Sequence, residues 1–464
     1  MKKKSTNMIL AILLFGTFIA FLNQTLMNVA LPSIMKNFGI DAAQGQWLTN
    51  GYLLINGIMV PTTAYLIDRF KTRNLYLTIM TIFAVGTLIC GISDNFTLLI
   101  IGRMLQAAGG GVVGPLLTVI VMRLYPIEHR GTAMGFIGLA MNFAPAIGPT
   151  LSGWIVQSFT WRYLFYMILP LVILNLILAA IFMPNIGEPK DISLHKPSIL
   201  LSSLGLGSLL LGFSNAGSHA WGSFNVAGYI LLGIVILMLF VRMQVKLKEP
   251  VLDFAVFKEK MFKLSTIANF FIIMGLYGGM LLLPLFLQNV KGVTPLQSGM
   301  VLLPGALSMA VLSPVTGNLF DKYGYKILSN IGLTILAIGT LPFIFFKPEA
   351  SLMVIALCQM VRNIGIAMVL MPIQTQAMNS LPDALLSHGN AMYNTIRQVA
   401  ASIGTAVLIT IMSTANSSYA SLHPEVTESA SLLFGIHTAY AVTFALGLVA
   451  LCILAFIKIP NKIK

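Results

Sequence analysis

The sequence predicts an all-α membrane protein made of two related helical bundles, and three observations predict this fold. Hydrophobic residues make up 57% of the 464 residues and charged residues only 9%, which is too little charge to solvate a soluble domain of this length. The apolar residues fall into runs of about 20 residues, the length needed to cross a bilayer. A charged motif also occurs twice, at Asp68 and at Asp321.

Hydrophobic periodicity predicts fourteen membrane-spanning helices joined by short loops. The longest predicted loops are 31–46 and 413–433 on the outer side, and 184–196 and 246–263 on the inner side. In chain order, the predicted spans are 8–30, 47–67, 75–93, 98–122, 131–156, 162–183, 197–216, 225–245, 264–287, 298–320, 327–346, 351–376, 389–412 and 434–457.

The distribution of basic residues predicts the orientation in the membrane. With the amino terminus inside, the inner segments hold 21 of the 28 Lys and Arg residues, whereas the outer loops hold Lys36, Arg162, Lys291 and Lys347. Because basic residues favour the cytoplasmic side, we expect both termini to be cytoplasmic and the protein to lie in the cell membrane as a multi-pass protein. No small-residue cleavage site follows the first apolar run, so we expect that run to be an uncleaved first helix.

Several function classes lack a sequence signal. The basic residues form short clusters without interleaved aromatics, so we expect no nucleic-acid partner. Cys90, Cys358 and Cys452 lie far apart in apolar segments and suggest neither a disulfide nor a metal site. No GxxxxGK[ST] loop indicates ATP as the energy source, and no Ser–His–acid group or paired acids indicates an enzyme. We expect no cofactor and no obligatory protein partner.

The duplicated motif reads AYLIDRFKTR at 64–73 and GNLFDKYGYK at 317–326, each at the inner end of a predicted span. An Asp at a helix end can pair with a base or cap a neighbouring helix, so each copy could form a latch that breaks when the protein changes conformation. The candidate coupling residues are Asp68, Arg69, Arg73, Asp321, Lys322 and Lys326.

The repeat also predicts the domain organisation, because duplicated parallel halves are common in transporters. We expect a six-helix bundle at 1–190, two inserted helices with an inner connector at 191–262, and a second six-helix bundle at 263–464.

A stripe of small and kinking residues runs along the fifth predicted span, GFIGLAMNFAPAIGPTLSG at 135–153. Two prolines four residues apart are tolerated in a membrane bundle, where neighbouring helices cover the freed carbonyls and small residues allow close packing. We expect this span to slide against the opposite half. Its candidate coupling residues are Gly148, Pro149 and Gly153.

Polar residues within the spans are candidates for a central cavity, because an ionisable or amide group in hydrocarbon needs a partner or water. No Asp or Glu falls in the middle of a predicted span. Arg103, near the outer end of the fourth span, could equally be structural, and we place it with the coupling residues. The candidate substrate-binding residues are Asn23, Gln24, Gln106, Asn142, Gln359, Arg362, Asn363, Tyr393, Asn394 and Arg397; Gln374 is a further neutral group.

Several motifs resemble the major facilitator superfamily, in particular its fourteen-span drug:proton antiporter family of the EmrB/QacA type. LNQTLMNVALP at 22–32 resembles the first-span motif of this family, and the LNQT form is similar to its lincomycin-resistance branch. GRMLQAAGGGVVGP at 102–115 and the stripe at 135–153 resemble the fourth-span and fifth-span motifs. The resemblance implies two six-helix bundles plus two extra helices, and export of small amphiphiles driven by inward proton flow.

The sequence departs from the family pattern at Asn23, where the family has Asp, and at Ala64 and Lys71, where it usually has Gly. Since a cationic drug in a low-dielectric cavity favours a carboxylate, we expect a preference for neutral, zwitterionic or anionic amphiphiles. On this reasoning, Asn23→Asp should improve export of quaternary ammonium dyes. A lipid or fatty-acid exporter, a nutrient importer and a non-transporting membrane receptor are the alternatives.

Overall fold

The computed structural model describes residues 3–40, 42–216 and 219–455, and these form helices and connecting segments with no strand among them. The helices are α1 (Lys3–Phe38), α2 (Ala42–Arg69), α3 (Thr72–Ile92), α4 (Phe96–Leu124), α5 (Ile127–Ser158), α6 (Tyr163–Phe182), α7 (Lys196–Asn215), α8 (Tyr229–Gln244), α9 (Lys260–Leu285), α10 (Pro295–Tyr323), α11 (Tyr325–Thr340), α12 (Leu352–Asn379), α13 (Leu386–Leu422) and α14 (Glu428–Ala455).

Thirteen helices in the described part of the chain are long and apolar enough to cross a membrane. The helix outside that group is α2, which carries Asn50, Asn56, Thr62 and Thr63 along its length. The all-helical prediction is therefore confirmed, while a count of fourteen spans stays a prediction.

The helix ends follow local sequence signals. The side chain of Asn95 caps α4 by accepting a hydrogen bond from the Leu98 amide at 2.8 Å. Thr294 and Gln297 form a capping box at the start of α10. Gly324 separates α10 from α11 with a φ of 78°, a backbone conformation that favours glycine.

The predicted outer loops are shorter than expected. The α1 helix continues to Phe38 and α2 begins at Ala42, while α13 continues to Leu422 and α14 begins at Glu428. The predictions of loops at 31–46 and 413–433 are therefore wrong over most of their length. Polar residues such as those of SSYASL at the end of α13 remain helical because their backbone hydrogen bonds need no apolar surroundings.

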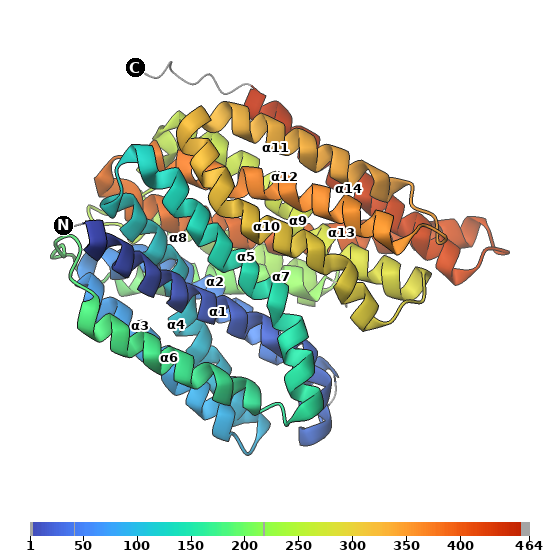
Figure 1. Ribbon diagram of the computed structural model, residues 1–464, viewed down its shortest axis with the longest axis horizontal. Helices are drawn as coiled ribbons and strands as arrows, with labels where there is room; N and C mark the ends of the chain where they lie inside the picture. Colours follow the sequence, from blue (N-terminus) through green and yellow to red (C-terminus); the bar gives the residue numbers. More distant parts are fainter. Residues whose placement is uncertain (1–2, 41, 217–218, 456–464) are drawn as a thin grey trace.

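The helices form two groups, α1–α6 (the N-terminal half) and α9–α14 (the C-terminal half). Figure 1 shows the two groups side by side at the end where α2 ends and α3 begins, and diverging toward the other end. We call these the closed end and the open end. The α5 and α10 helices make the main contact between the halves, together with α2 and α13. The α7 and α8 helices pack on each other, and α7 contacts α2 and α13.

The two halves repeat the same helix packing. Gly86 of α3 is so close to α4 that a Cβ on it would lie 2.7 Å from the backbone nitrogen of Gln106. Gly339 of α11 is just as close to α12, because a Cβ on it would lie 2.4 Å from the backbone nitrogen of Arg362. These contacts make the α3–α4 seam equivalent to the α11–α12 seam. They also give Arg362 the position that Gln106 has in the first half.

Candidate substrate cavity and closing contacts

A cavity lies between the two halves, and the space in it that protein atoms leave unfilled, counted out through its open side, is about 580 Å³. Helices α1, α2, α4 and α5 line it from one half, and α12 and α13 from the other. The lining residues are Ala20, Phe21, Gln24, Tyr52, Asn56, Val60, Gly110, Gly111, Gly114, Pro115, Thr118, Met141, Gln374, Asn394, Arg397 and Gln398.

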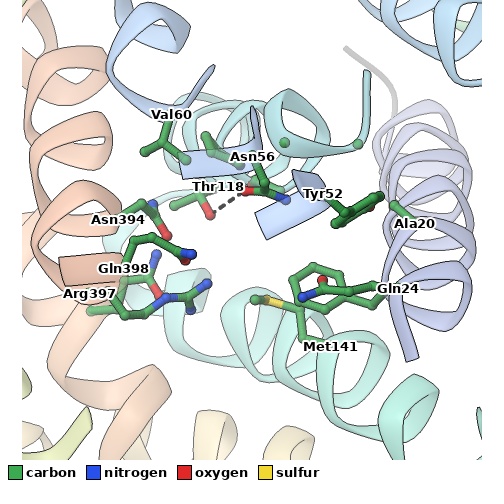
Figure 2. Close-up of a pocket in the computed structure, with 16 residues that line it drawn as sticks. Ala20, Gln24, Tyr52, Asn56, Val60, Thr118, Met141, Asn394, Arg397 and Gln398 are labelled. Atoms are coloured by element: carbon green, nitrogen blue, oxygen red, sulfur yellow. Dashed lines mark hydrogen bonds between the residues drawn. The ribbon is translucent and has the colours of Figure 1, made fainter. Parts of the chain in front are cut away.

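The polar lining consists of neutral groups and one cation. Figure 2 shows Asn394, Arg397 and Gln398 on the α13 wall, with Gln24 and Tyr52 across the space from them. No carboxylate is among the residues that line this cavity, and no ion pair of Arg397 is found in the described residues. Amides can donate and accept, so such a surface suits uncharged polar groups, and Arg397 suits a negative one.

Three of the ten predicted binding residues line the cavity: Gln24, Asn394 and Arg397. Asn23 and Gln106 lie one layer behind the wall in a buried network. The Gln106 amide donates to Asn23 Oδ1 at 3.4 Å and to Thr87 Oγ1 at 2.9 Å. Arg103 donates to Gln106 Oε1 at 2.9 Å.

The other predicted binding residues lie elsewhere in the fold. Asn142 of α5 donates to Ser313 Oγ of α10 at 3.3 Å, across the seam between the halves. Gln359 and Asn363 bond to each other within α12 at 3.4 Å. Tyr393 is buried one helical turn before Arg397 and is not part of the cavity wall.

Arg362 corrects the sequence-based expectation most clearly, because it lines a different crevice inside the C-terminal half. Gln374 of the same helix reaches the cavity. At 3.6 residues per turn, a residue twelve positions earlier points about 120° away. A membrane arginine can therefore belong to the inside of one bundle rather than to the space between two.

Sequence analysis missed Tyr52, Asn56, Thr118 and Gln398 as lining residues. Tyr52, Asn56 and Val60 follow one another at four-residue spacing along one face of α2, a signal that is visible in the sequence. The same helix falls outside the apolar group, since one of its faces lines the cavity rather than lipid.

Asp321 connects the halves at the closed end. From α10 it accepts hydrogen bonds from the amides of Gly131 and Thr132, at 2.8 and 2.7 Å, and from the Thr132 hydroxyl at 2.6 Å. These donors lie in the first turns of α5, where the helix dipole favours negative charge. Gly131 and Gly317 allow this approach, because a Cβ on Gly317 would lie 2.2 Å from the Gly131 carbonyl oxygen.

Asp68 makes the reciprocal contact from α2 to the start of α13. Ser387 donates its hydroxyl to Asp68 Oδ1 at 2.6 Å, and the Asp68 side chain is only 1% exposed. Arg123 and Lys190 compensate its charge at 3.2 and 2.6 Å. The second helix of each half thus sets a carboxylate against the fifth helix of the other half.

Further hydrogen bonds between the halves lie on the closed-end side of the cavity. Arg130 of α5 donates to Asn379 Oδ1 of α12 at 3.0 Å, and Asn390 of α13 donates to the Pro115 carbonyl of α4 at 2.8 Å. Together with the two aspartates, these bonds close one end of the space between the halves.

In the described residues, the other basic residues of the duplicated motif make no hydrogen bond or ion pair with the opposite half. Arg69 pairs with the exposed Asp191 at 2.5 Å, and Arg73 donates to the Ala180 carbonyl. Lys322 lies over the ring of Tyr323, 5.1 Å from its centroid, and no interaction of Lys326 is found among the described residues. Arg103 is 1% exposed and lies over the Tyr52 ring at 4.4 Å, so it joins α4 to α2.

The small-residue stripe of α5 divides into two parts. Gly131, Gly135 and Gly138 pack against α10 of the opposite half. Gly148 lies against Thr25, and Gly153 lies near Val29, both in α1 of the same half. Ser152 donates to the Leu26 carbonyl at 2.7 Å. The GPTLSG segment, with Pro149, therefore faces its own half, because the halves have diverged at that level.

Comparisons with known proteins agree with this architecture. The chain matches the model of the Major Facilitator Superfamily over residues 13–405. It is 43% identical to the uncharacterized MFS-type transporter YcnB of Bacillus subtilis, over 99% of this chain and 97% of that protein. It is 40% identical to the lincomycin resistance protein LmrB of Listeria innocua, over 96% of this chain and 94% of that protein.

A solved structure shows the same fold at low sequence identity. The crystal structure of the human organic anion transporter MFSD10 matches with a TM-score of 0.69 and 15% identity, over 97% of this chain and 99% of that one. The family match covers most of the chain, from α1 into α13, and includes all the residues that line the cavity between the halves. This chain is a multi-pass plasma-membrane transporter, not an enzyme, and it belongs to the major facilitator superfamily.

Proposed function

We propose that this protein exports amphiphilic drugs across the cell membrane by alternating access. The observation that carries the proposal is the cavity between the two halves, which amides and Arg397 line and which reciprocal contacts of Asp68 and Asp321 close at one end. A substrate held there reaches the other side when the closed-end contacts break and the open end closes.

The basic residues of the short loops support placing the closed end and both termini in the cytoplasm. In that orientation the conformation described here is open to the outside. The division into 1–190, 191–262 and 263–464, with fourteen spans in all, belongs to the same proposal. The α7–α8 pair then forms an insertion at the side of α2 and α13.

The similarity to the lincomycin resistance protein LmrB supports drugs as substrates. It also makes lincomycin the first compound to test. Since the lining contains Arg397 and no carboxylate, we infer a preference for neutral, zwitterionic or anionic amphiphiles over permanent cations. Inward proton flow is the proposed driving force. The carboxylates among the coupling candidates are Asp68 and Asp321, and Asp68 is the more buried of the two.

Inside-out membrane vesicles test the proposal. With an acidic lumen, we expect uptake of labelled lincomycin, and collapse of the pH gradient should abolish it. The same assay is repeated with Asp68, Asp321, Arg103, Arg362 and Arg397 neutralised one at a time; loss of the pH response in a single variant locates the coupling residue. Uptake that is indifferent to the gradient in the unmodified protein would overturn proton coupling.

Export of a lipid or fatty acid through the same cavity is the alternative. Reconstitution into proteoliposomes separates the two, because a lipid exporter moves labelled lipid between leaflets and leaves lincomycin uptake at background.

A further inference from the structure

A second crevice lies within the C-terminal half, apart from the cavity between the halves. It is a narrow crevice lined by α9, α11, α12 and α14, and the space that atoms leave unfilled there, counted out through its open side, is about 330 Å³. Its walls are mainly apolar, with Phe271, Leu276, Leu336 and Phe444 among them. Ala337 and Gly447 also line the crevice. The residues that follow them in sequence, Ile338 and Leu448, are exposed on the outside of the bundle. In a membrane, this outer surface faces lipid.

Arg362 lies in the wall of this crevice, and one nitrogen of its guanidinium is unpaired in the described residues. The residue is 2% exposed, and Nη2 donates to the Gly275 carbonyl at 3.2 Å. Among the described residues Nε has no hydrogen-bond partner, and neither has the hydroxyl of Tyr440, one helical turn before the lining residue Thr443. In the described residues no carboxylate lies within ion-pair distance of Arg362.

Arg103 shows how the same fold satisfies a buried arginine. It donates to Gln106 Oε1 and, more weakly, to the Leu48 carbonyl, and it lies over the Tyr52 ring. Arg362 has, in the C-terminal half, the position that Gln106 has in the N-terminal half, and it lacks such a set of partners among the described residues. A buried cation without a counter-ion is costly in hydrocarbon, so the crevice has a net attraction for an anion.

We propose that this crevice binds the carboxylate of a long-chain fatty acid that enters from the bilayer, with Arg362 as its counter-ion. Arg362 Nε is an unpaired donor that can pair with a carboxylate oxygen, and the buried Tyr440 hydroxyl is a second unpaired donor close to the crevice. The apolar residues around the crevice contact the first carbons of the acyl chain, and the rest of the chain lies in lipid. The site is accessory to the transport cavity, since it lies inside one half and takes its ligand from the side.

Direct binding of labelled oleate to the purified protein in non-ionic detergent tests this site without any gradient or transport. Failure of the drug-export proposal therefore leaves the result unaffected. We expect one oleate site. Arg362→Gln should weaken oleate binding by about tenfold or more, as expected for the loss of a charge-assisted hydrogen bond. Tyr440→Phe should weaken it less. Oleyl alcohol, which has the same chain without the charge, should not compete.

Gly447→Leu tests the crevice without touching its charge. Gly447 lines the opening and has no atom within 4 Å of where a Cβ would lie, so a leucine fits there and fills the entrance. Gly299 of α10 has equally open space, and Gly299→Leu is the matched control. We expect Gly447→Leu to abolish oleate binding and Gly299→Leu to leave it unchanged.

Three results would overturn the proposal. These are full oleate binding by the correctly folded Gly447→Leu protein, equal competition by oleyl alcohol, and preferential binding of oleyl phosphate over oleate with the same dependence on Arg362. If Arg362→Gln does not fold, the comparison of the two glycine variants still decides the question.

Discussion

Replacing Asp321 with Asn should shift the protein away from the conformation in which its closed end is shut. Asp321 accepts three hydrogen bonds from the start of α5. An Asn side chain keeps one carbonyl oxygen, which can still accept from the Gly131 amide. The amide group that replaces the second oxygen cannot accept from Thr132, and the negative charge beside the helix amino terminus is lost.

The size of the shift follows from these contacts. A hydrogen bond to a charged group contributes about 1.5–3 kcal/mol when it is buried. Since Asp321 is only half-buried, solvent screening reduces the combined loss of two such bonds to about 2 kcal/mol. A difference of about 2 kcal/mol changes an equilibrium constant by roughly 30-fold. We therefore expect the ratio of closed to open molecules at this end to fall by about that factor.

Cysteine accessibility measures the shift. The three native cysteines, Cys90, Cys358 and Cys452, are free and can be replaced. Ser313 is 1% exposed beside Asn142 in the seam between α10 and α5, so Ser313→Cys reports opening. A membrane-impermeant maleimide added from the closed end should label this cysteine much faster in the Asp321→Asn background.

Asp191→Asn is the matched control, because it removes an exposed carboxylate at the same end, whose one ion pair in the described residues is with Arg69 of its own side. It should leave the labelling rate unchanged. If both variants raise the rate equally, general loss of negative charge explains the effect. If neither does, the Asp321 contact does not hold the closed end shut and our reasoning is refuted.

Three further predictions concern the seam, the cavity and the core. Gly317→Val should abolish drug export at normal expression, because even a Cβ at this position would lie 2.2 Å from the backbone of α5; normal efflux would contradict the tight seam. Gln24→Glu, on the cavity wall, should increase ethidium efflux more than Asn23→Asp, which places its charge one layer behind; the reverse order would contradict our placement of the cavity. Tyr76→Phe should lower stability by about 1–2 kcal/mol, because it removes a buried hydroxyl with two hydrogen-bond partners. Tyr393→Phe should have little effect, because the Tyr393 hydroxyl has no hydrogen-bond partner among the described residues. Thermal unfolding in detergent compares the two variants.

The sequence was sufficient for the helical architecture and for the two aspartates at the ends of α2 and α10. Both predictions rest on local signals, namely apolar run length and a motif that occurs twice. The reciprocal docking of each aspartate on the fifth helix of the other half could not be read from the motif alone. It depends on how Gly131 and Gly317 let two backbones approach across the seam.

The cavity residues were harder to predict, because residue type does not define which way a helix face points. Arg362 and Arg397 are both arginines in apolar helices, yet one lines a crevice inside its own half and the other lines the central cavity. Tyr52 and Asn56 were missed since tyrosine and a single amide are common in membrane helices. They line the cavity because the face of α2 that carries them is turned toward it in the folded bundle.

Paired spin labels across the two ends provide the most direct measurement of the central claim, that the two halves rock as units around the cavity. One pair would connect the closed-end tips of α2 and α13, and the other the open-end tips of α1 and α10. On adding lincomycin, and on lowering the pH, we predict that the closed-end distances lengthen while the open-end distances shorten in the same molecules. Distances that change at only one end, or at neither, would contradict the account.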